Sequence, residues 1–169
     1  MLRRPKSSFV SSNTVNLPKY LPMDPLSFTA SLIAVIGTAA TVAKELNALQ
    51  VSLRDASGLL SALINEISDL RIILEACSSA VTELYRTSNT ANPPTPLADA
   101  EKILNRTKCH LEDLEKAILS CFKGSSDLSN ISRGVKLRWL REKGKVERLQ
   151  GKLRDSKQHL LMLLESQSV

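Results

Sequence analysis

The sequence predicts an all-α protein, an up-and-down bundle of about four long helices with a central hydrophobic N-terminal helix. Helix-favouring residues dominate, with only six Gly and 4% aromatic residues in 169. Apolar residues recur at spacings of three, four and seven in four long segments, which is the period of an amphipathic helix. Short polar stretches separate these segments, as in a bundle whose consecutive helices are antiparallel.

The first helix is expected from about Asp24 to Leu53. Asp24-Pro25 is a start signal, because an Asp cap accepts free backbone amides and proline has no amide to leave unpaired. Two series of apolar residues recur every seven positions: Phe28, Val35, Val42 and Leu49, and Leu32, Ala39, Leu46 and Leu53. A helix that is apolar on all sides must be covered by other helices or by lipid.

Residues 26–43 of this helix form a run of 18 without charge, which just reaches the length of a membrane span. Its strongly apolar side chains favour insertion by roughly 2 to 4 kcal/mol in total, and five Ser or Thr and Gly37 oppose it. These side chains are Leu26, Phe28, Leu32, Ile33, Val35, Ile36 and Val42. Two interpretations follow: a buried core helix, or a membrane-active helix that enters a bilayer after a conformational change.

The second and third helices have narrower apolar stripes. A turn at 54–58 precedes the second, and Pro93 and Pro94 interrupt the chain within a loop expected over 86–95. Thr95-Pro96 starts the third helix, which is expected to end near Phe122. The second stripe is Leu60, Leu63, Ile67, Leu70, Leu74, Cys77, Val81 and Leu84, and the third is Leu97, Ala100, Leu104, Leu111, Leu114, Ile118 and Cys121.

The fourth helix is expected from about Ser132 to Glu165 and lies in the most basic part of the chain. Residues 120–157 hold eleven Lys or Arg and four acidic residues, in a chain of net charge +6. Its apolar face is Trp139, Val146, Leu149, Leu153, Leu160 and Leu163. Five cations at spacings of three and four form a second stripe, the basic ridge: Arg138, Arg141, Lys145, Arg148 and Lys152.

Two interpretations of the basic ridge are open. Each cation near an anionic membrane surface contributes about 1 kcal/mol of attraction, so the ridge suits lipid phosphates. Alternatively, the ridge is a solvated face that pairs with acidic residues of neighbouring helices. The acidic residues considered are Glu66, Asp69, Glu112 and Glu115.

Residues 1–22 are basic, acid-free and Ser-rich, and contain three prolines, so a flexible basic extension is expected there, before a domain over 23–166. A mitochondrial presequence has a similar composition. A solvated tail, or a translation start at Met23 in place of Met1, explains the same residues.

No constellation for catalysis or metal binding is evident. The three cysteines form no CxxC pair, which favours a reducing, cytoplasmic location. Cys109-His110 with His159 offers too few ligands for tetrahedral zinc, and Gly144 to Leu153 lacks phosphate-loop spacing. We therefore expect no enzyme activity, no metal and no cofactor. Nucleic acid is disfavoured as a partner because stacking aromatics are scarce.

Two segments resemble the fungal N-terminal domain of STAND proteins, the HeLo-like domain of NOD-like receptors. They are Met23 to Ile36 (MDPLSFTASLIAVI) and Leu137 to Lys143 (LRWLREK), the latter followed by Val146 to Leu164, and the similarity spans Met23 to about Ser166. The sequence departs from relatives at Leu140, where proline is frequent, and at Gly144 inside the helix.

This resemblance implies a helical-bundle signalling domain of regulated cell death or innate immunity-like responses. It implies a non-enzymatic effector that assembles with other subunits, as a homo-oligomer or with a receptor, and associates with the membrane on activation. The alternative is an adaptor bundle for protein–protein interaction without membrane activity. Whether the chain is a stand-alone module or part of a larger receptor is open.

Overall fold

The computed structural model describes residues 25–53, 57–87, 96–123 and 131–166, and these form four α-helices and no strand. The helices are α1 (Pro25–Ser52), α2 (Ser57–Thr87), α3 (Pro96–Phe122) and α4 (Ile131–Ser166). The predicted all-α bundle with a hydrophobic N-terminal helix is confirmed. Two helices begin at the expected prolines, whereas α2 continues through Arg86 and Thr87, which the sequence placed in a loop. The extension expected over 1–22 lies outside the described residues.

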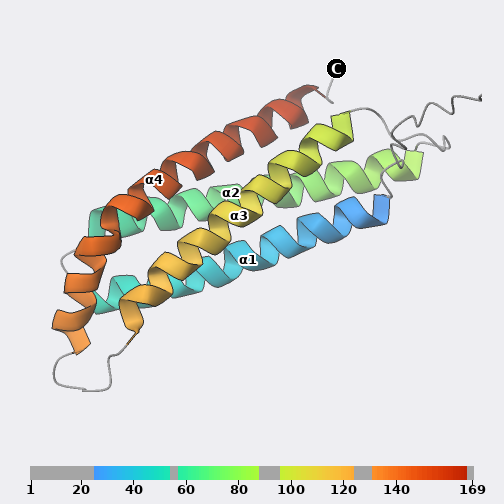
Figure 1. The fold of residues 1–169 in the computed structure, drawn as a ribbon. Helices are drawn as coiled ribbons and strands as arrows, with labels where there is room; N and C mark the ends of the chain where they lie inside the picture. Colours follow the sequence, from blue (N-terminus) through green and yellow to red (C-terminus); the bar gives the residue numbers. More distant parts are fainter. Residues whose placement is uncertain (1–24, 54–56, 88–95, 124–130, 167–169) are drawn as a thin grey trace, which may run out of the picture.

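The helices alternate in direction along one bundle, as Figure 1 shows. Each of α1 and α4 packs against both α2 and α3. The order around the bundle is therefore α1, α2, α4, α3, and the chain passes between diagonal partners when it goes from α2 to α3. As a result the two flanks of α4 face different helices, α2 on one side and α3 on the other.

The core is built from the stripes that the sequence predicts. Both seven-residue series of α1 are buried along their whole length, from Phe28 to Leu53. Buried leucines and isoleucines of α2 and α3 and the face of α4 around Trp139 and Leu153 complete one continuous cluster. Leu84 and Leu97 belong to predicted stripes, but their side chains lie outside the described set.

Helix α1 occupies a corner of the bundle, and its main neighbours are α2 and α3. The expectation that other helices cover α1 on all sides is therefore corrected. Its outer side consists mainly of small residues, such as Ala30, Ala34, Gly37 and Ala40, all of them exposed. Small side chains have little apolar area to bury, so leaving them in water costs little free energy. Ile33 is the exception within the uncharged run, because it is 62% exposed.

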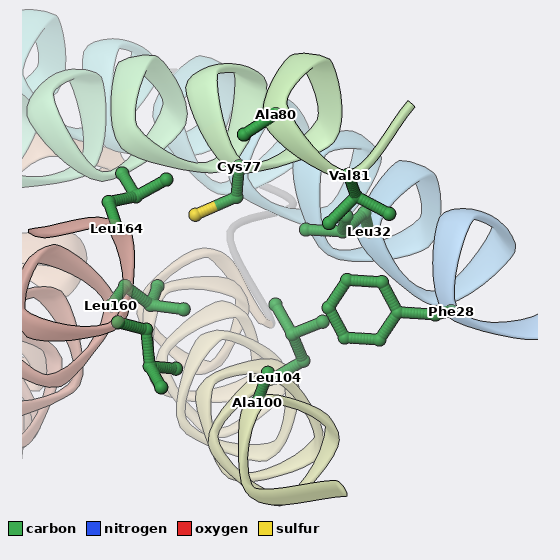
Figure 2. A pocket seen from close by; sticks show the side chains of 10 residues that line it. Phe28, Leu32, Cys77, Ala80, Val81, Ala100, Leu104, Leu160 and Leu164 are labelled. Atoms are coloured by element: carbon green, nitrogen blue, oxygen red, sulfur yellow. The ribbon is translucent and has the colours of Figure 1, made fainter. Parts of the chain in front are cut away.

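Apolar side chains of all four helices converge where α1 begins and α4 ends (Figure 2). Phe28 and Leu32 of α1 line a cavity of about 30 Å³ there, together with Cys77, Leu104 and Leu160. Burial raises the pKa of the Cys77 thiol to about 11. The N-terminal turns of α1 are thus anchored in the same core as the rest of the helix.

Candidate interaction surface

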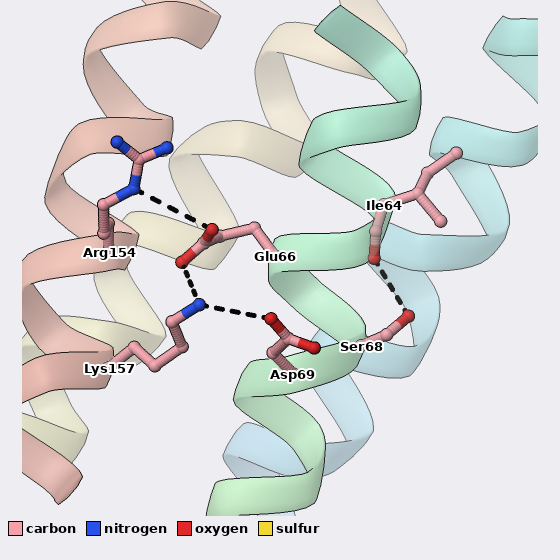
Figure 3. Close-up of polar contacts among 6 residues, drawn as sticks. All are labelled: Ile64, Glu66, Ser68, Asp69, Arg154 and Lys157. Atoms are coloured by element: carbon pink, nitrogen blue, oxygen red, sulfur yellow. Dashed lines mark hydrogen bonds and ion pairs between the residues drawn. The ribbon is translucent and has the colours of Figure 1, made fainter. Parts of the chain in front are cut away.

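The flank of α4 that faces α2 carries a network of ion pairs (Figure 3). The Lys157 Nζ atom lies 2.7 Å from Glu66 Oε1 and donates a hydrogen bond of 3.3 Å to Asp69 Oδ2. Arg154 Nε lies 3.9 Å from the other Glu66 oxygen. The Glu66 side chain is only 11% exposed, so its charge is held in a partly desolvated site by two cations.

The charge of Lys157 is stabilised by these partners. Burial disfavours its charged form, but the hydrogen bonds and the negative charges of Glu66 and Asp69 outweigh burial and raise the pKa of Lys157. This network therefore joins α2 to α4 through Glu66 and Asp69.

The basic ridge does not find the partners that the sequence suggested. Glu66 and Asp69 pair with Arg154 and Lys157, and the nearest cation to Glu112 is Lys108 of its own helix, at 3.9 Å. Within the described ranges, no ion pair joins an acidic side chain to the four ridge cations after Arg138. These are Arg141, Lys145, Arg148 and Lys152, and all four are exposed.

Two ridge residues contact backbone oxygens. Arg138 is half-buried and its Nη1 atom donates to the carbonyl oxygen of Cys121 at 3.4 Å, which ties the start of α4 to the end of α3. Arg148 Nε donates to the Gly144 carbonyl one turn earlier in the same helix, at 3.2 Å. The ridge thus begins at the α3 contact and runs along the α3-facing flank of α4.

Leu137 and Leu140 lie beside the ridge and are large apolar residues in water. They are 70% and 61% exposed. Neither leucine is among the site residues that the sequence predicts. The signal was present, because both fall outside the apolar stripe of α4 and within one turn of Arg141. Exposed leucines among cations form an amphipathic outer surface on the first half of α4.

Further along the same flank, an open cleft of about 260 Å³ lies between α3 and α4. Arg106 and His110 line it from α3, and Lys152, Asp155 and His159 line it from α4. His110 is half-buried. Burial, followed by the positive charges of Lys152 and Arg106, lowers the pKa of His110, and nearby Asp113 opposes this.

The residues predicted to form a membrane-active helix differ in how far they are buried. Phe28, Leu32, Val35 and Val42 are core residues, whereas Ile36 is only partly buried. Ile33 projects into solvent, and the side chain of Leu26 lies outside the described set. One helix of the described part, over Ser27–Ser52, is long and apolar enough to cross a bilayer, a criterion that core helices of soluble proteins also meet.

The cysteines are all free thiols, with Cys77 and Cys121 buried as their stripes predict and Cys109 exposed. No three His, Cys, Asp or Glu side chains of the described ranges are grouped so that they would hold a metal ion.

Comparisons with known proteins give no relative: no family model, curated protein or solved structure matches the chain.

Proposed function

We propose that this chain is a non-enzymatic signalling bundle that binds anionic membrane surfaces through the outer surface of α4. The observation that carries the proposal is the coincidence of two features on one helix. Leu137 and Leu140 are exposed apolar side chains, and the neighbouring cations Arg141, Lys145 and Arg148 have no acidic partner in the described ranges. The resemblance to HeLo-like domains supports the same class of function.

The physical basis is the usual one for peripheral membrane binding. Leucines at the acyl boundary gain the free energy of leaving water, and cations at the headgroup level gain electrostatic attraction. Three cations at about 1 kcal/mol each supply roughly 3 kcal/mol, which is weak by itself and becomes effective with the leucines or with several subunits. Assembly with other copies or with a receptor therefore strengthens the same contact.

Insertion of α1 is a later step in this proposal, because α1 must first leave the core. Phe28, Leu32, Val35 and Val42 are each at most 3% exposed. At about 1.5 to 3 kcal/mol per side chain, exposing them to water costs roughly 6 to 12 kcal/mol. That amount is similar to the whole stability of a typical domain, so α1 stays in the bundle until lipid or neighbouring subunits replace its contacts.

Co-sedimentation with vesicles tests the first step. We expect the wild-type protein to pellet with vesicles rich in phosphatidylserine and not with neutral phosphatidylcholine vesicles. The double change Leu137→Ser and Leu140→Ser is expected to weaken binding by about tenfold or more, since each leucine contributes its apolar burial. Ile72→Ser removes another exposed apolar residue, on α2, and is the matched control that keeps wild-type binding.

Leakage of a dye from the same vesicles tests the second step. Ile33→Asp places a charge on the exposed side of α1, so the fold is retained, whereas the membrane-inserted helix is penalised by about 3 kcal/mol. Val51→Asp is the control, because Val51 is also exposed on α1, at 78%, and lies outside the uncharged run. Leakage that is unchanged by Ile33→Asp contradicts insertion of α1.

The adaptor alternative predicts a different result in these assays. No vesicle binding, together with a protein partner that is lost when Arg141 and Arg148 are changed to Glu, would favour an adaptor that uses this surface for another helical domain.

A further inference from the structure

The cleft between α3 and α4 has the composition of an anion-binding site. Arg106 stands on the α3 wall and Lys152 on the α4 wall, with His110 and His159 in the same lining. Neither Arg106 nor Lys152 forms an ion pair within the described ranges, although acidic residues are near. Asp155 is part of the lining, and Asp113 pairs with Lys116 at 3.5 Å.

Two further features concern His110. Its Nδ1 atom is buried and has no hydrogen-bond partner in the part of the chain that the structure describes. A buried polar atom without a partner is unfavourable, and such atoms often indicate a water or ligand. Lys152 and Arg106 also disfavour the imidazolium form of His110, so an arriving negative charge would relieve a local repulsion.

The volume and the donors define the class of ligand. At about 260 Å³ the cleft is near the lower end of the roughly 300 to 1,000 Å³ usual for ligand pockets. The lining does not supply the three grouped ligands that a metal ion needs. Cations on opposite walls suit a compact group with several acceptor oxygens, which is the chemistry of phosphate.

We propose that this cleft binds a phosphate group, with Arg106 and Lys152 balancing its charge and His110 and His159 donating hydrogen bonds. The group belongs either to a small soluble phosphate ester or to a phosphorylated lipid headgroup. The site shares no residue with the proposed membrane-binding surface, which consists of Leu137, Leu140, Arg141, Lys145 and Arg148.

The test uses inorganic phosphate without lipid and reads the two histidines by proton NMR. Binding of an anion favours the protonated imidazole, so we expect phosphate to raise the pKa of His110 relative to chloride at equal ionic strength. Arg106 and Asp113 on α3, and Lys152, Asp155 and His159 on α4, are the charged and titratable groups that face His110. Fits of the shift against phosphate concentration give the affinity.

Charge-removing variants distinguish phosphate binding in the cleft from general electrostatic attraction to a basic protein. Arg106→Gln and Lys152→Gln are each expected to lower the affinity about tenfold or more, as for loss of a charged hydrogen bond. Arg86→Gln and Lys102→Gln remove the same charges from exposed positions outside the cleft and are expected to leave the affinity unchanged. Lys145→Gln with Arg148→Gln, which tests the membrane proposal, is also expected to leave phosphate binding intact.

A second arm separates the two sources of phosphate. Vesicles with phosphatidylinositol 4-phosphate are compared with phosphatidylserine vesicles of equal surface charge, in wild type and in Lys152→Gln. Binding of inorganic phosphate that depends on Arg106 and Lys152 supports a soluble ligand, and Lys152-dependent preference for the phosphoinositide supports a headgroup. Absence of both effects, or equal affinity in the cleft variants and their controls, overturns the proposal.

Discussion

Both flanks of α4 carry Lys and Arg, but the two flanks differ in whether these cations form ion pairs with neighbouring helices. On the α2 side, Lys157 and Arg154 meet Glu66 and Asp69, and the charges stabilise the fold. On the α3 side, Lys145 and Lys152 have no acidic partner within the described ranges and line or border open surface. The difference teaches that basicity by itself does not indicate a binding surface, and it limits the proposed surface to the cations that form no ion pair within the described ranges.

The largest expected effect is on the paired flank. Glu66→Gln leaves Lys157 and Arg154 without their shared carboxylate, and we expect unfolding free energy to fall by about 2 to 3 kcal/mol, as when one partner of a partly buried pair is removed. Urea denaturation measures this. Glu75→Gln, in an exposed pair of the same helix with Arg71, is expected to cost less than about 1 kcal/mol. Equal costs for the two changes would remove the distinction between them.

The next largest effect is expected when one lysine on each flank is replaced by glutamine and the two losses of stability are compared. Lys157→Gln removes a cation with two acidic partners, and we expect a loss of about 1 to 2 kcal/mol in unfolding free energy. Lys152→Gln removes a cation that forms no ion pair within the described ranges, and it is expected to change stability by no more than about 0.5 kcal/mol. A loss on Lys152→Gln as large as that on Lys157→Gln would mean that the α3 flank also contributes to stability.

Alkaline pH gives a smaller effect with a definite sign. Because the folded pKa of Lys157 is raised, its contribution is fully present below the unfolded lysine pKa of about 10.4 and is lost as pH rises through the folded value. Unfolding free energy measured from pH 9 to 11 should therefore fall more steeply in wild type than in Lys157→Gln. Parallel curves for the two proteins would show that Lys157 has no such role.

The smallest effect concerns His110. Removing the positive charge of Lys152 favours the imidazolium, so Lys152→Gln should raise the pKa of His110 in the absence of phosphate. Proton NMR titration of the His110 ring measures the shift. Lys102→Gln, at an exposed position of α3, serves as the reference and should give no shift.

Much of the fold follows from local signals in the sequence. Pro25 and Pro96 start helices because proline is favoured only in the first turn, and the seven-residue series of α1 face the core because their period matches the helix. What the sequence did not reveal was that the outer side of α1 needs no cover. The uncharged residues on that side are mostly small. The lack of charge therefore suggests more apolar surface area than these side chains have.

The candidate interaction surface was only partly predictable, because ion pairs depend on which helices are neighbours. The basic ridge is periodic and therefore visible in the sequence. An ion pair between the ridge and Glu66 would need the ridge to lie on the α2-facing flank of α4, but that flank carries Lys157. Likewise, Arg106 and Lys152 both line the α3–α4 cleft although most of α3 and half of α4 separate them in the sequence. No local sequence pattern predicts that two such distant residues lie close together.

The most direct test compares two charge-matched double variants in sedimentation with phosphatidylserine vesicles. Lys145→Gln with Arg148→Gln removes one Lys and one Arg from the α3-facing flank, where neither cation forms an ion pair within the described ranges. Lys143→Gln with Arg154→Gln removes the same charges where each cation has an acidic partner, Glu147 and Glu66 respectively, at 3.9 Å. We expect the first variant to bind about thirtyfold more weakly than wild type, from about 1 kcal/mol per cation, and the second to change binding less than about threefold. Equal losses in both, or no binding by wild type, would contradict a membrane-binding surface on this flank of α4.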